Sequence, residues 1–150
     1  MEQAIMATHH TYTIWKYIVA GFLAGLITAA LNNILFFFLP MLLNFEYPLI
    51  LDEMALSLGS FFPPIIATIF YYFVSSKNYE KGTKVYISLV MIGFLISIGV
   101  QFFPEQLINT GFLQAGDIPH NLALITVPFH VTTALVALIF IPKFVGSKED

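Results

Sequence analysis

The chain has 150 residues, of which 58% are apolar and only 10% charged, with a formal net charge of −3 at pH 7. Soluble domains carry about 25% charged residues, and one core of this size cannot cover so much apolar surface, so the composition excludes a soluble globular protein. With no Cys, no Arg and no basic patch, it also excludes disulfides, thiolate metal sites, cysteine nucleophiles and nucleic acid as a partner.

Four apolar segments are long enough to cross the hydrocarbon core of a bilayer, which takes about 20 helical residues. In chain order we expect them at about 17–39, 58–74, 85–103 and 121–141. Pro40 and Pro142 are expected to end the first and the fourth, and Pro63-Pro64 to kink the second. The sequence therefore predicts an all-α fold, a four-helix antiparallel transmembrane bundle that forms a single domain over 1–150.

Charge predicts the orientation of this bundle. With four crossings, all six lysines lie on one side, and the two loops on the other side, about 40–57 and 104–120, contain acids but no Lys. By the positive-inside rule both termini are cytoplasmic, with membrane lipids as the surroundings of a multi-pass protein. The two outer loops mix acids with large apolar residues, which predicts either a purely structural lid or a mouth that gathers cations or a ligand. Trp15, Tyr17, Tyr71 and Tyr72 fall at expected span boundaries, which is typical of interfacial aromatic belts.

Small and polar residues share one face in three of the predicted spans, and membrane helices pack through such faces. On the first span these residues are Gly21, Gly25, Thr28 and Asn32, on the third Gly93, Ser97 and Gln101, and on the fourth Ala123, Thr126, His130, Thr133 and Ala137. We expect helix packing at Gly21, Gly25, Gly93 and Ala137. Antiparallel packing of the first span on the fourth is expected to place Thr28 level with His130.

The same packing places Asn32 level with Thr126, near the middle of a bilayer about 30 Å thick. We therefore predict a mid-membrane polar cluster that binds a ligand and consists of Thr28, Asn32, Thr126, His130 and Thr133. A charged His at this depth is costly, so we expect a neutral imidazole. It either donates to a backbone carbonyl or hydroxyl and only holds the helix register, or handles a ligand or a proton, or binds a metal or haem.

The sequence lacks the residues that several kinds of membrane-protein chemistry require. His130 and His120 lie on one predicted helix about 15 Å apart, so they cannot clamp one haem. No span contains a carboxylate for proton-coupled export, and nothing around Ser97 resembles a nucleophile motif. Asp117 and His120 form only a loose outer metal-binding possibility, and capping of the fourth helix by Asp117 or by the turn at Pro119 is favoured. We expect no cofactor, no metal and no catalytic residue.

The segments "WKYIVAGFLAGLITAALNNILF" and "LALITVPFHVTTALVALIFIPKF" resemble a family of small bacterial four-span inner-membrane proteins of unknown function. The resemblance lies in a charged residue before a Gly- and Ala-rich first span with an Asn, and in a fourth span whose His130 precedes a run ending in Pro142. It implies a multi-pass protein of the bacterial cytoplasmic membrane and no particular activity.

Three functions are consistent with these features. The first is non-enzymatic binding or passage of a small or lipophilic ligand through the polar cluster. The second is an accessory or scaffold subunit whose Gly21 and Gly25 contact another membrane protein or a second copy in a homo-oligomer. The third is a membrane redox or haem subunit. A cavity that reaches His130 favours the first, and exposed glycines favour the second.

Overall fold

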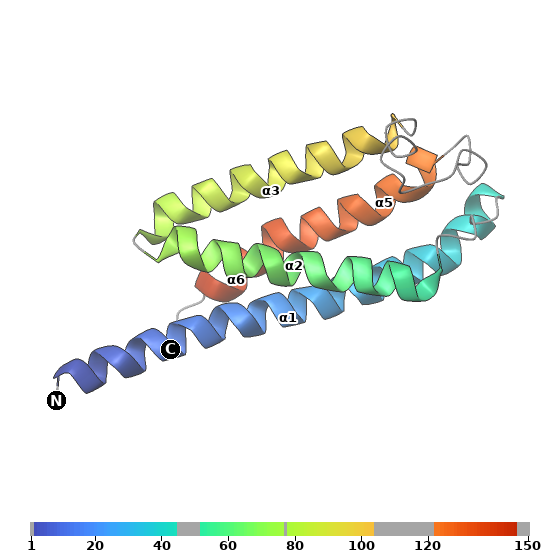
Figure 1. Ribbon diagram of the computed structural model, residues 1–150. Coiled ribbons are helices and arrows are strands. Elements are labelled where there is room, and N and C mark those ends of the chain that lie inside the picture. Colours follow the sequence, from blue (N-terminus) through green and yellow to red (C-terminus); the bar gives the residue numbers. More distant parts are fainter. Residues whose placement is uncertain (1, 45–51, 77, 104–121, 147–150) are drawn as a thin grey trace.

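The computed structural model describes residues 2–44, 52–76, 78–103 and 122–146, and side chains from Ile14 onward. All the elements in these ranges are helical (Figure 1). They are α1 (Glu2–Leu43), α2 (Glu53–Ser75), α3 (Tyr79–Gln101), α5 (Leu122–Leu135), the π-helical segment η2 (Val136–Phe140) and α6 (Ile141–Gly146). The last three follow one another without a break, and we call them together the C-terminal rod.

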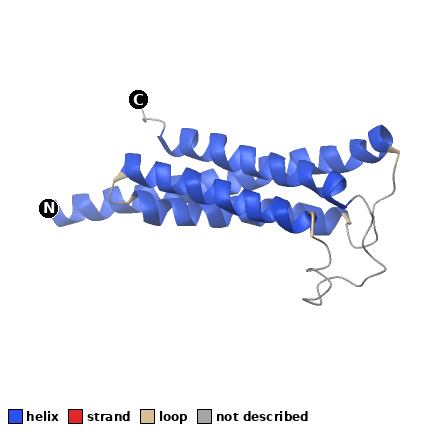
Figure 2. Ribbon diagram, turned by 90° about the horizontal axis from the view of Figure 1, so that it is seen from above, coloured by secondary structure: helices blue, strands red, loops and turns tan. Residues whose placement is uncertain are grey.

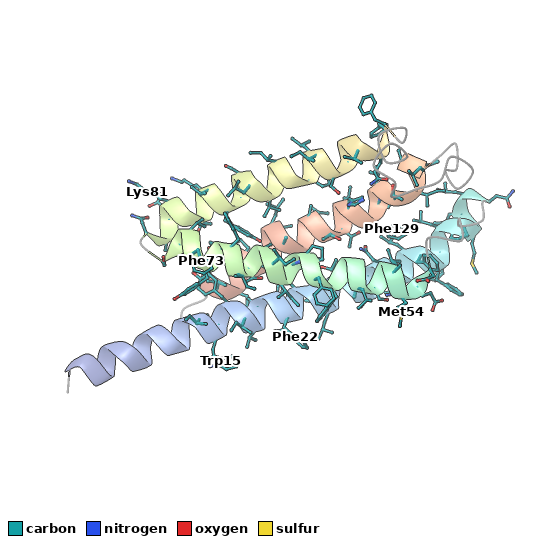
Figure 3. All side chains as sticks on the ribbon, in the orientation of Figure 1. Trp15, Phe22, Met54, Phe73, Lys81 and Phe129 are labelled. Atoms are coloured by element: carbon teal, nitrogen blue, oxygen red, sulfur yellow. The ribbon has the colours of Figure 1, made fainter. Side chains whose placement is uncertain are left out.

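Four helical segments are long and apolar enough to span a membrane, and they pack antiparallel (Figures 1 and 2). They are Ile14–Leu43, Glu53–Ser75, Tyr79–Gln101 and Leu122–Gly146. Large apolar side chains such as Trp15 and Phe22 point away from the bundle (Figure 3), as helices surrounded by lipid require. The predicted fold class is confirmed, and the protein is a multi-pass membrane protein.

One end of the bundle carries the start of the first span, the turn between α2 and α3, and the end of α6 (Figure 1). Because the helices alternate in direction, the described lysines gather at this end, which we call the lysine end: Lys16, Lys81, Lys84 and Lys143. The lysine pattern that predicted both termini on the same side of the membrane therefore corresponds to described lysines that gather at one end of the bundle.

α2 and α3 begin before their apolar runs because a polar side chain caps each of them. The carboxylate of Asp52 accepts the amide of Ala55 at 2.6 Å, and the side-chain oxygen of Asn78 accepts the amide of Lys81 at 2.9 Å. Such caps satisfy N–H groups that the first helical turn leaves unpaired. Local polar residues thus extend both helices beyond the ends that hydropathy predicted.

Two prolines lie inside helices that were expected to end there. α1 continues past Pro40, and the C-terminal rod continues past Pro142. A proline has no N–H, so a carbonyl about one turn before it loses its helical partner, and a π-helical turn is one local adjustment to this loss. Just before Pro142 the rod adopts this geometry in η2, and the Tyr86 hydroxyl donates to the carbonyl of Ala137 at 2.9 Å.

Both ends of the first predicted outer loop are helical in the structure. In the loop predicted at about 40–57, residues 40–43 belong to α1 and 53–57 to α2. Residues 45–51, and the loop predicted at about 104–120, lie outside the described residues.

The glycine face of α1 packs on α2, whereas we had expected it to face the fourth span. A side chain at Gly21 would place its Cβ 2.5 Å from the hydroxyl oxygen of Thr68, and one at Gly25 would lie 2.6 Å from the carbonyl oxygen of Phe61. These approaches are possible only without side chains, as in other small-residue helix contacts. Gly21 and Gly25 are therefore buried inside this chain.

The hydrophobic core near the lysine end contains three buried tyrosines, Tyr17, Tyr71 and Tyr86. Tyr71 stacks on Tyr86 with ring centroids 4.4 Å apart, and Tyr17 meets Tyr71 edge-on at 5.3 Å. The Tyr17 hydroxyl also lies 2.7 Å from the hydroxyl of Ser75. Tyr17 and Tyr71 are buried between helices, so the prediction that they form an interfacial belt was wrong for these two residues.

α3 is the least buried of the four spans. Its fully buried residues, Gly82 and Tyr86, both lie near the lysine end, where α3 packs against α2. Farther along, α2 and α3 diverge (Figure 1), and α3 contacts the C-terminal rod through Ser97 and Gln101. This divergence leaves room between α2, α3 and α5 at mid-depth.

Candidate functional site

Asn32 links three helices from a fully buried position on α1. Its amide nitrogen lies 2.8 Å from the hydroxyl of Ser60 on α2, and 3.3 Å from both the Phe129 carbonyl and the Thr133 hydroxyl on α5. A carbonyl oxygen only accepts, so the contact with Phe129 requires the nitrogen of the amide on that side. Asn32 and Thr133, two members of the predicted cluster, are thus brought into direct contact.

Thr28 is also buried, but its hydroxyl donates to the Ala24 carbonyl of its own helix at 2.8 Å. The expected register, with Asn32 level with Thr126, is also wrong, because Asn32 meets Phe129 and Thr133, which lie about one and two turns farther along α5. The position of α1 along the bundle axis is set by its close packing on α2. The predicted register compared only the polar residues of the first and fourth spans and did not include this contact.

His130 lies in a second hydrogen-bonded group, between α5 and α3. Its Nδ1 is 2.7 Å from the Ser97 hydroxyl, and its Nε2 is 3.4 Å from the amide nitrogen of Gln101. The side-chain oxygen of Gln101 lies 3.1 Å from the Thr126 hydroxyl, which also bonds the Leu122 carbonyl at 2.7 Å. The predicted polar cluster is therefore split into an Asn32 group and a His130 group.

Two hydrogen-bond partners of the predicted polar cluster were not assigned to it from the sequence. Ser97 was placed with Gly93 and Gln101 on one face of the third span without being paired with His130, and in the structure it directly contacts His130. Ser60 was not singled out, although Ser60, Pro64 and Thr68 recur every four residues and are all buried on one face of α2. That spacing was the available signal for a polar residue facing Asn32.

A cavity of about 290 Å³ lies between α2, α3 and α5. Its lining is mostly apolar, with polar side chains of Ser97, His130 and Thr133 on one wall. Among the described residues, the lining consists of Gly59, Pro63, Pro64, Ala67, Val90, Gly93, Phe94, Ser97, His130, Thr133, Ala134 and Ala137.

The cavity is bordered by residues that are exposed on the outside of the bundle. Gly59 and Gly93 are both exposed, and a Cβ added to either would meet no atom within 4 Å. Gly93 therefore does not make the close helix contact that we expected of it, whereas Ala137 is buried in the core. Gly59 on α2 and Gly93 on α3 therefore leave open space at the edge of the cavity between these two helices.

Within the described residues, no three His, Cys, Asp or Glu side chains lie close enough to hold a metal ion. The possible outer site at Asp117 and His120 lies outside those residues. Comparisons with protein families, with curated proteins and with solved structures find no match to this chain.

Proposed function

We propose that this protein binds a small lipophilic ligand in the cavity between α2, α3 and α5. The observation that carries the proposal is that the cavity reaches His130 and Ser97 at mid-depth. Ligand sites are mostly apolar with a few polar groups that fix orientation, and the cavity has this composition. Ionisable residues inside a membrane span are costly and tend to serve function, which supports a role for His130.

Other hypotheses receive less support from the described residues. A scaffold subunit was expected to expose Gly21 and Gly25, but both are buried against α2. We further propose that the lysine end faces the cytoplasm of a bacterial cell, because lysines accumulate on that side of membrane proteins.

Native mass spectrometry of the protein extracted with its lipids tests ligand binding. We expect one retained small molecule per chain in the wild type, and its loss in Gly93→Trp, because the indole fills the cavity without meeting protein atoms at Cβ. His130→Leu should lose it as well, since the polar anchor is removed. Thr132→Val is the matched control, because Thr132 bonds the Pro128 carbonyl and does not line the cavity. Identical bound masses in wild type and Gly93→Trp would contradict the proposal.

The 2.7 Å contact between Ser97 and His130 supports a second candidate function, acyl transfer. A serine hydroxyl next to an imidazole is an arrangement in which the ring accepts the proton as the oxygen attacks. If it operates here, a lipophilic fluorophosphonate should form a bond between phosphorus and Ser97 Oγ, with fluoride leaving and the proton passing to His130. Peptide mass spectrometry should then locate the adduct at Ser97. Labelling that persists in Ser97→Ala, or no labelling of the wild type, excludes this candidate.

A further inference from the structure

We propose that the polar wall of the cavity offers hydrogen-bond acceptors and no free donor, so that its ligand carries a hydroxyl group on a lipophilic body. Long-chain alcohols, phenols and hydroquinols belong to this class, whereas ethers, esters, aldehydes and quinones do not. The inference rests on the proposed ligand-binding function and adds the chemistry of the ligand's head.

The hydroxyl hydrogen of Ser97 points at His130. Hydroxyls on α5 donate to the carbonyl four residues earlier, as Thr126 does to Leu122 at 2.7 Å and Thr133 does to Phe129 at 2.8 Å. Among the described residues, the one hydrogen-bond partner of Ser97 Oγ is His130 Nδ1. If Nδ1–H donated instead, the Ser97 hydrogen would have no acceptor among the described residues, so we assign the Ser97 hydrogen to Nδ1, and the neutral ring then carries its own hydrogen on Nε2.

That Nε2 hydrogen needs an acceptor, and the Gln101 amide provides one when it is turned by 180°. The nitrogen and oxygen of a side-chain amide are assigned from the hydrogen-bond network, because the two atoms are nearly identical in size. As placed, the amide nitrogen faces Nε2 at 3.4 Å, and the single Thr126 hydrogen would have to serve both Gln101 and Leu122.

After the turn the hydrogens of Ser97, His130 and Thr126 each have one acceptor, and so has one of the two Gln101 N–H hydrogens, while Gln101 itself does not line the cavity. His130 donates to the Gln101 oxygen, the Gln101 nitrogen donates to Thr126, and Thr126 donates to Leu122. The contact given up is the longest of the set, from the amide nitrogen to the Ser97 carbonyl at 3.5 Å. Both ring nitrogens of His130 are then engaged within the protein, and neither donates into the cavity.

The remaining polar atoms of the lining also accept. Thr133 has its hydrogen on the Phe129 carbonyl, and Asn32 donates to its oxygen from the other side. Gly59 lines the cavity, and the residue four positions later is Pro63, which has no N–H to donate to the Gly59 carbonyl. Lone pairs of Ser97 and Thr133 and the Gly59 carbonyl therefore define the polarity of the wall. A hydroxyl that donates is the complementary group.

Titration of the delipidated full-length protein with three matched compounds tests this inference. The compounds are 1-dodecanol, its methyl ether and dodecanal, with bound fractions measured by native mass spectrometry. We expect the alcohol to bind at least ten-fold more tightly than the other two, and Gly93→Trp to bind none of them. Ser97→Ala should reduce the preference for the alcohol to a few-fold. Ser88→Ala, an exposed serine on α3, should leave it unchanged.

The outcomes separate the two proposals. Equal binding of the alcohol and the ether that is lost in Gly93→Trp would retain the ligand site and overturn the acceptor-only wall. Tighter binding of dodecanal would overturn it as well, because a carbonyl needs a donor. If no compound binds the wild type more than it binds Gly93→Trp, the ligand site itself is refuted.

Discussion

Gly82→Ala is expected to lower the free energy of unfolding by about 3 kcal/mol, because a methyl group has no room there. A Cβ at this position would contact backbone atoms of α2: the Ser75 Cα, the Val74 carbonyl oxygen at 2.5 Å and the Ser75 nitrogen at 2.7 Å. Backbone atoms of a packed helix cannot turn aside as a side chain can. The substitution should therefore push α3 away from α2 at the lysine end and loosen the tyrosine core.

Gly93→Ala provides the matched control on the same helix. Its added Cβ meets no atom within 4 Å, and alanine favours a helix over glycine by about 1 kcal/mol. We expect it to be neutral or slightly stabilising. Reversible unfolding of both variants in mixed micelles measures the difference, and equal stabilities would show that α3 does not pack on α2 as described.

Asn32→Leu is expected to cost about 1–3 kcal/mol of stability. The change removes the donor that joins Ser60, Phe129 and Thr133, and leaves these acceptors without it inside the bundle. It also removes the buried side-chain oxygen of Asn32, which has no hydrogen-bond partner among the described residues, and this partly offsets the loss. The same unfolding measurement detects the effect.

Asn33→Leu is the neighbouring control. Asn33 is partly exposed and bonds the Ala29 carbonyl and the Ser57 hydroxyl, both at 2.8 Å, so it links α1 to α2 but not to the C-terminal rod. We expect a loss below about 1 kcal/mol, in the range usual for single hydrogen bonds in membrane proteins. A loss as large as that of Asn32→Leu would contradict the assignment of Asn32 as the residue that joins three helices.

For the candidate site, the sequence predicted well which residues face the inside of the bundle. It predicted less well which of these residues contact one another. The inward positions of Asn32, His130 and Thr133 follow from the spacing of polar residues along single helices, a property of 3.6 residues per turn. Their partners depend on how far one helix is displaced along another. A shift of one turn is about 5.4 Å, enough to exchange Thr126 for Phe129 opposite Asn32 without any change in hydropathy.

Gly21 and Gly25 show the same difference between the face of a helix, which the sequence predicts, and the neighbour that packs on it, which the sequence does not predict. The spacing of Gly21 and Gly25 indicated a close helix contact, but a small-residue face fits any neighbour that offers a complementary surface. α2, which follows α1 in the chain, occupies that face. The cavity could not be predicted at all, because it results from the divergence of α2 and α3 beyond Gly82 and Tyr86, and no residue pattern along one helix records that angle.

By itself, the sequence determined that four apolar helices cross a membrane in alternating directions with the lysines at one end. Those properties are sums over single segments, since the length and hydropathy of each helix decide whether it spans, and charge decides which end is which. The tertiary structure alone decided that His130 pairs with Ser97 and Gln101, that Asn32 joins three helices, and that a cavity lies between them. These features depend on the angle between packed helices and on how far one is displaced along another. Hydropathy does not fix that displacement, because equally apolar helices can pack in many registers. Close contacts such as Gly25 on Phe61 and Gly82 on Ser75 determine which register forms.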